Sequence, residues 1–167
     1  PPDAPASGAA LQQLRQQQGG KVSCMPAVGP FSGGDGPVEI VQTAHQLTWM
    51  AEEMHAIRRI FLKGTFTPGL APTYNGESIG HFEGDTLVIE TRGMKGLADG
   101  VHMLERMTKS EQGRVLEDVV RFVDAQGRDA GPGRTLKLFY RPNERMLEWI
   151  CEDYGQRYQP GGYDREL

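Results

Sequence analysis

The sequence predicts an all-β protein: an antiparallel, lipocalin-like up-and-down barrel of eight or nine strands with a loose N-terminal tail. Apolar and polar residues alternate over much of the chain with the period of two that a half-buried strand requires. The chain also holds 22 glycines and 11 prolines, which suits short strands joined by tight turns. Its 167 residues allow one substantial core and are too few for two ordinary domains.

The two ends of the chain lack this alternation. Residues 1–23 are rich in Pro, Ala and Gln, and we expect a flexible or weakly helical tail there. The barrel domain is expected over 24–155, beginning with a loop over 26–37, and a C-terminal tail over 156–167.

The first predicted hairpin joins the alternating run over 38–53 to the run over 55–64, because almost nothing separates them. A loop over 66–76 follows, since its prolines are incompatible with a central strand. Three further hairpins are centred on turn-forming residues, namely Glu83–Gly84–Asp85, Glu111–Gln112–Gly113 and "RPNER" at 141–145.

Strands that are consecutive in sequence can close into a barrel or form a two-sheet sandwich. We favour the barrel because closure leaves no unpaired edge. A barrel of eight strands is also the size at which one small ligand fits inside.

Several blocks of the sequence carry a resemblance to a known family. They are "PTYNGESIGHFEGDTLVIETRGM" at 72–94, "EIVQTAHQLTWMAEEMHAIRRIFLKG" at 39–64, "LERM" and "ICEDYG". They resemble a largely uncharacterised family of small secreted bacterial proteins with a PTW, GHSIG and WEGDTLV core, abundant in bacteria that degrade aromatic and terpenoid compounds. The chain departs from that core at Tyr74, Glu77 and Phe82, where the family has Trp, His and Trp.

The two cysteines, Cys24 and Cys151, can be two buried thiols or a disulfide that fastens the N-terminal segment to the last strand. Family members commonly have cysteines at both positions, so the resemblance implies the disulfide. It also implies a periplasmic or secreted protein whose signal peptide has been removed.

Composition excludes some functions. A net charge of −4 and a pI of about 5.6 argue against a nucleic-acid partner, which needs a concentrated basic face. No run approaches the roughly 18 apolar residues of a membrane span. No metal-ligand spacing and no phosphate-binding glycine motif is present, so we expect neither a metal nor a cofactor, with metal ligands gathered from separate strands of the barrel as the alternative.

Three glutamates, Glu90, Glu105 and Glu148, share strand faces with apolar residues. If those faces form the outer wall, the carboxylates simply reach solvent. If they line the cavity, burial raises the carboxyl pKa and prepares the group for acid–base work. Both faces of the strand around Glu90 are apolar, so periodicity leaves the choice open. We expect Glu90 and Glu105 to be catalytic.

Basic residues nearby bear on the same site. Arg58 and Arg59 lie on opposite faces, so one must point inward if the strand is central. An inward arginine can form a structural ion pair with a glutamate or bind an anionic ligand group. We assign Arg59 to stabilise developing negative charge and His45, which shares a face with Leu47 and Trp49, to acid–base catalysis. A strand histidine can equally be structural.

Aromatic and neighbouring residues provide candidate walls for a flat ligand, although such residues are more often core. Those expected to bind substrate are Trp49, Tyr74, His81, Phe82 and Tyr140.

The sequence favours a cofactor-free lyase, isomerase or dehydratase that acts on a small apolar or aromatic ligand, because acid–base groups suffice for these reactions. The alternative is a non-catalytic carrier with glutamates outside and arginines in salt bridges, and a scaffold protein is a third hypothesis. Whether the barrel is a homo-oligomer stays open.

Overall fold

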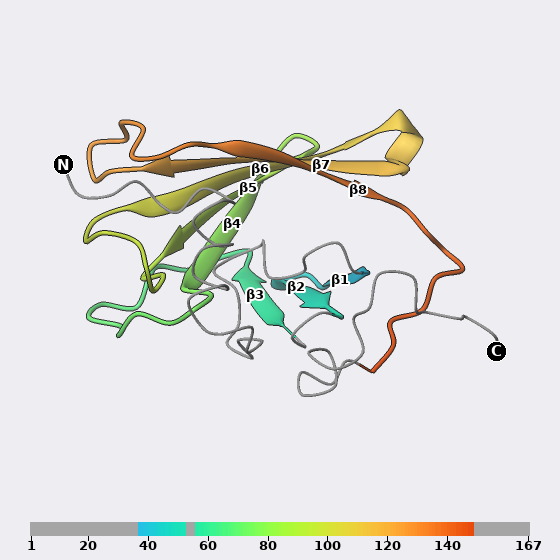
Figure 1. Ribbon diagram of the computed structural model, residues 1–167, viewed down its shortest axis with the longest axis horizontal. Coiled ribbons are helices and arrows are strands. Elements are labelled where there is room, and N and C mark those ends of the chain that lie inside the picture. Colours follow the sequence, from blue (N-terminus) through green and yellow to red (C-terminus); the bar gives the residue numbers. More distant parts are fainter. Residues whose placement is uncertain (1–36, 53–55, 149–167) are drawn as a thin grey trace, which may run out of the picture.

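The computed structural model describes residues 37–52 and 56–148, which form one curled sheet of eight strands (Figure 1). The strands lie in chain order across the sheet. They are β1 (Val38–Gln42), β2 (Gln46–Ala51), β3 (Ile57–Phe61), β4 (Glu77–Glu83), β5 (Thr86–Arg92), β6 (His102–Ser110), β7 (Val115–Val123) and β8 (Arg134–Phe139). In the described part of the chain the only helical segment is the 3-10 turn η3 (Glu111–Gly113), so the all-β class is confirmed.

The sheet bends round at β4, so that β1–β3 lie below β5–β8 in Figure 1 and the whole forms a half-barrel. β1 and β8 are its two ends, and no pairing joins them among the described residues. The predicted tails and both cysteines, Cys24 and Cys151, lie outside the described ranges. None of the helices found in those ranges is long and apolar enough to cross a membrane.

One pairing differs from the antiparallel prediction. β3 and β4 run parallel, with Ile60 opposite Ser78 and Phe61 opposite Ile79, whereas the six other pairings are antiparallel. The physical reason is the connection over 62–76, which carries the chain back along the sheet before β4 begins. The strictly up-and-down order is therefore wrong at this position.

The run over 38–53 forms two strands rather than one. Its turn is stabilised by Thr43, whose Oγ1 accepts hydrogen bonds from the backbone N–H groups of His45 (3.3 Å) and Gln46 (3.1 Å). A threonine hydroxyl often satisfies a turn in this way. The expected hairpin between 38–53 and 55–64 is present as the antiparallel pairing of β2 with β3.

Two predicted turns are confirmed at the residues named. Gly84 joins β4 to β5 with a φ of 60°, and Gly113 precedes β7 with a φ of 83°. Both angles lie in the left-handed region that favours glycine. The last predicted turn also forms, with the Glu144 N–H donating to the Arg141 carbonyl at 3.1 Å. In the described residues no strand follows it, and β8 pairs only with β7.

One face of the sheet is buried, and we call it the inner face. Buried and partly exposed residues alternate strictly along β2 and β5, as the period of two requires. The main apolar cluster lies on this face and comprises Leu47, Trp49, Ile60, Leu87, Ile89 and Met107. A second, smaller cluster holds Met94, Met103 and Val120.

Candidate functional site

A row of polar side chains crosses the otherwise apolar inner face. Five consecutive strands, β3 to β7, each contribute one buried polar residue, and we call these the Arg58 cluster: Arg58, Ser78, Thr91, Glu105 and Asp118. Each member is at most 2% exposed. Burying this much polarity is unfavourable unless the groups satisfy one another.

Arg58 makes most of the hydrogen bonds in the cluster. Its Nε donates to Ser78 Oγ at 3.1 Å, and its Nη2 donates to Thr91 Oγ1 at 2.7 Å. Nη1 donates to Glu105 Oε1 at 2.8 Å, and Nη2 also bonds to Glu105 Oε2. The ion pair is thus bidentate, which is the strongest geometry that a guanidinium and a carboxylate can adopt.

The structure decides which arginine faces inward. Burial alternates along β3, so that Arg58 and Ile60 are buried while Arg59 is exposed. Arg59 was expected to stabilise developing negative charge in the site. Its side chain instead points away from the Arg58 cluster. An inward arginine paired with an inward glutamate was one of the two expected arrangements, and the Arg58–Glu105 pair has that arrangement.

Glu105 occupies the predicted face of its strand. It lies on β6 between Met103 and Met107, both buried, and its own exposure is 0%. Its ladder partners are Ile89 on β5 and Val120 on β7, so apolar residues surround it on both sides. The Glu105 carboxylate accepts its hydrogen bonds from Arg58, and Arg58 in turn donates to Ser78 and Thr91.

Asp118 is the member of the cluster that sequence reasoning missed. It lies on β7 opposite Met107, is fully buried, and neither carboxyl oxygen accepts a hydrogen bond from any described residue. Burial, followed by the negative charge of nearby Glu105, raises the pKa of Asp118 to about 8. Asp118 is therefore protonated at neutral pH, and a protonated carboxyl can donate to Glu105.

A signal for Asp118 was present in the sequence. Asp118, Val120 and Phe122 occupy every second position along β7. The structure buries Asp118 and Val120 and leaves Phe122 partly buried. An acidic residue in phase with apolar ones was the criterion applied to the glutamates, and it applies equally here.

The remaining predicted acid–base residues lie elsewhere. Glu90 is on the opposite face of β5 from Ile89 and Thr91, where its Oε1 accepts a 2.7 Å bond from Arg92 Nε. His102 Nε2 lies 4.0 Å from the same Glu90 oxygen. This face is partly exposed, so Glu90 corresponds to the outer-wall alternative. His45 is exposed in the turn before β2, and Glu148 is exposed after β8.

Of the residues expected to bind substrate, only Trp49 lies in the apolar cluster of the inner face. His81 and Phe82 are exposed near the end of β4, with His81 3.3 Å from the Glu83 carboxylate. Tyr74 is partly buried in the 62–76 connection, and the Lys95 ammonium lies 4.7 Å from the centre of its ring.

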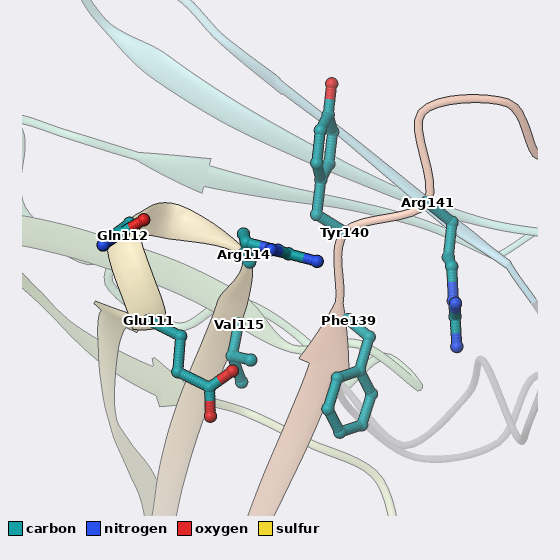
Figure 2. Close-up of a pocket in the computed structure, with 7 residues that line it drawn as sticks. All are labelled: Glu111, Gln112, Arg114, Val115, Phe139, Tyr140 and Arg141. Carbon is teal, nitrogen blue, oxygen red and sulfur yellow. The ribbon is translucent and has the colours of Figure 1, made fainter.

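Tyr140 lines a different hollow, which Figure 2 shows at the end of the β7–β8 ladder. This hollow has a volume of about 330 Å³. It is lined by Glu111, Gln112, Arg114, Val115, Phe139, Tyr140 and Arg141. None of these belongs to the Arg58 cluster, so the structure does not bring Tyr140 to Glu105.

Among residues 37–52 and 56–148, no group of three or more His, Cys, Asp or Glu side chains is arranged to hold a metal ion. The chemistry available at the Arg58 cluster is proton transfer, from a carboxyl that carries its proton at neutral pH beside a carboxylate held by a guanidinium. No family model, curated protein or solved structure matches this chain.

Proposed function

We propose that the protein binds a small, mostly apolar or aromatic molecule at the inner face and transforms it by acid–base chemistry that needs no cofactor. Lyase, isomerase and dehydratase reactions belong to this class. The observation that carries the proposal is Asp118, a fully buried carboxyl without a hydrogen-bond donor among the described residues and with its pKa raised to about 8. Acid–base catalysis is often based on two carboxyl groups whose surroundings give them different pKa values, so that one is protonated while the other is ionised.

In this proposal the two carboxyl groups have different roles. Asp118 carries a proton at neutral pH and gives it to an oxygen or carbon of the substrate. Glu105 is held by hydrogen bonds from the Arg58 guanidinium, so its position beside Asp118 is fixed while Asp118 gives up its proton. In an isomerisation the substrate returns a proton from another position to Asp118, and the reaction is balanced without a redox step.

A carrier without catalytic activity is the second candidate, and one observation favours it. Glu105, Ser78 and Thr91 engage all three nitrogens of the Arg58 guanidinium. The pair then serves to hold β3 against β6, and the inner face binds its ligand through apolar contacts alone.

We propose that the half-barrel is part of a lipocalin-like barrel that works in the periplasm or outside the cell, with Cys24 bonded to Cys151. The consecutive strand order and the curl of the sheet support the barrel. The family resemblance of 72–94 supports the location, and association into a homo-oligomer is compatible with both.

The test is a screen of the purified protein against lignin-derived aromatic compounds and terpenoids, in which binding and product formation are both followed. Wild type should bind and convert at least one compound. Asp118→Asn keeps the shape of the side chain but replaces the acidic carboxyl by an amide that cannot give up a proton. This variant should retain binding and lose turnover.

Glu117→Gln is the matched control, because Glu117 is the neighbouring acid on β7, partly exposed and paired with Lys137 at 3.2 Å. It should retain turnover. Binding without product in wild type would establish the carrier. Normal turnover in Asp118→Asn would remove Asp118 from the mechanism.

A further inference from the structure

The hollow at the end of the β7–β8 ladder combines positive charge with aromatic surface (Figure 2). Arg114 and Arg141 both line it, together with the rings of Phe139 and Tyr140. Phe139 is 60% exposed and Tyr140 is 69% exposed, so the rings are open to a ligand. The volume of about 330 Å³ is within the range of small-molecule sites and has room for one substituted aromatic ring.

The two arginines of the hollow have no partner in the described part of the chain. Their guanidinium groups form no hydrogen bond or ion pair with any residue there. Five other arginines do form ion pairs with carboxylates, namely Arg58, Arg92, Arg106, Arg121 and Arg128. Arg114 and Arg141 can therefore bind an anion without first breaking a contact within the protein.

The register of the ladder places Arg114 beside Tyr140. Val115 pairs with Phe139, and one residue further on the Tyr140 N–H donates to the Arg114 carbonyl at 2.8 Å. Side chains of directly opposite residues lie on the same face of the ladder, with their Cβ atoms roughly 5 Å apart. A ligand ring that stacks on Tyr140 therefore has its substituents within reach of the Arg114 guanidinium. A planar carboxylate on that ring can accept two parallel hydrogen bonds from the guanidinium.

The charges that surround the hollow favour a ligand with a single negative charge. Glu111 also lines it, and the Glu111 carboxylate has no partner among the described residues. Two guanidinium groups and one carboxylate leave a net charge of +1 at the hollow. A carboxylate ligand matches this charge, whereas Glu111 repels a dianion such as a phosphate monoester more strongly.

The turn at the rim of the hollow has an unusual backbone. Glu111 and Gln112 have φ angles of 48° and 59°, and within the described ranges they are the only non-glycine residues with a positive φ. A left-handed backbone is unfavourable for a residue that has a Cβ, and such positions often occur at ligand sites. The side chains held there border the hollow, where the Gln112 amide can donate to or accept from a polar substituent on a ring.

We propose that this hollow is a second binding site, which takes an aromatic carboxylate. The carboxylate binds the Arg114 guanidinium, the ring stacks on Tyr140, and Arg141 adds positive charge. No residue that lines the hollow belongs to the Arg58 cluster, so this site is separate from the inner-face site and does not depend on its proposed function.

The test compares aromatic acids with their uncharged amides. Benzoate is paired with benzamide and cinnamate with cinnamamide, and the backbone amide signals of the full chain are followed by NMR titration. We expect wild type to bind at least one acid about fivefold more tightly than its amide, a modest factor because the ion pair is exposed to solvent. The shifts should centre on Gly113, Arg114 and Tyr140. Added salt should reduce the preference for the acid, because it screens the charges.

Variants of the two central residues locate the site. Arg114→Gln removes the positive charge and should abolish the preference for the acid over the amide. Tyr140→Leu removes the ring and should weaken the binding of both compounds several-fold. Arg59→Gln and Phe82→Leu are the matched controls, because both residues are exposed and neither lines the hollow. Both controls should bind as wild type does, and so should Asp118→Asn at the inner face.

Several results would overturn the inference. Equal affinity of wild type for acid and amide would do so, as would the failure of both acids to bind. A preference for the acid that survives in Arg114→Gln also overturns it. Acid binding that is lost in Asp118→Asn would place the carboxylate at the inner face instead. None of these results decides the proposed function, which depends on turnover at the inner face, and the wild-type comparison needs no variant to fold.

Discussion

Arg58 and Glu105 are 47 residues apart and meet in a bidentate ion pair, although two strands lie between their own strands in the sheet. In a flat sheet β3 and β6 would be separated by roughly 14 Å, three spacings of about 4.8 Å. The curl of the half-barrel shortens this separation. The guanidinium also bonds to Ser78 and Thr91 on the two intervening strands, so a single side chain links four strands.

The first prediction concerns the stability that depends on this pair. Arg58→Met should lower the free energy of unfolding by about 3–5 kcal/mol, because it leaves the Glu105 charge buried without its partner. Arg59→Met is the matched control at the neighbouring, exposed position. This variant should change the free energy of unfolding by less than about 0.5 kcal/mol. Urea unfolding of the two variants measures the difference.

The double variant Arg58→Met with Glu105→Met extends this prediction. It should recover most of the lost stability, because replacing both members of a buried ion pair by apolar residues is often neutral or better. Equal stabilities for Arg58→Met and Arg59→Met would contradict the buried pair. The two charges would be shown not to interact if the double variant lost as much free energy of unfolding as Arg58→Met and Glu105→Met lose together.

The second prediction is a pH dependence of stability that originates at Asp118. Its pKa rises from 3.8 to about 8 on folding, so the folded state holds a proton that the unfolded chain releases above about pH 4. The contribution of the Asp118 proton to the free energy of unfolding is complete below about pH 4 and is lost as the pH rises to about 8. The free energy of unfolding should fall across this window with a slope of up to about 1.4 kcal/mol per pH unit.

Asp118→Asn removes the titrating group and should flatten the curve between about pH 4 and pH 8. The charges that act on Asp118 are Glu105 from β6, Arg58 from β3 and Arg134 from β8. Glu83 and Asp124 have lowered pKa values, so their contributions are lost only at more acidic pH. Glu117→Gln should keep the wild-type slope, and a wild-type slope in Asp118→Asn would assign the effect to another group.

A third prediction separates the two carboxyl groups of the candidate site. Glu105→Gln should abolish turnover and also destabilise the fold, because a neutral amide leaves the Arg58 charge uncompensated. Asp118→Asn should abolish turnover at little cost in stability near neutral pH, where the native carboxyl is already uncharged. Turnover assays and urea unfolding of both variants, performed at the same pH, measure the two effects. Undiminished turnover in Glu105→Gln would exclude Glu105 from the mechanism.

Local chemistry explains what the sequence could predict. The turns at Gly84 and Gly113 need a positive φ, and the alternating runs need one buried face, so both were predictable from neighbouring residues. The parallel pairing of β3 with β4 was not predictable, because it depends on the path of the whole 62–76 connection.

The candidate site was predictable only in part. Glu105 was found because Met103 and Met107 define its face. Glu90 and Arg59 were assigned to the site although both lie on the other face, since apolar residues occur on both sides of β3 and β5. Which face becomes the inside is decided by the curl of the sheet, and periodicity carries no information about that direction.

The fourth prediction concerns Gly76, which lies just before β4 and lets that strand approach the end of β5. Its φ is +64°, and a Cβ there would lie 2.4 Å from the Arg92 carbonyl oxygen and 2.9 Å from Thr91 Cγ2. Gly69 is the matched control, with a φ of +69° and no atom within 4 Å of its Cβ position. Gly69→Ala should cost only the left-handed backbone strain, about 1–2 kcal/mol.

Gly76→Ala should lower the free energy of unfolding by about 3 kcal/mol or more. It adds to the same backbone strain a steric clash with the Arg92 carbonyl, which is held in the sheet. The displacement would fall on Thr91, which bonds to both Arg58 and Ser78, so the variant should also weaken binding at the inner face. Urea unfolding and ligand titration of the two alanine variants measure these effects. Equal costs at the two glycines would show that the close approach of β4 to β5 does not hold the Arg58 cluster in place.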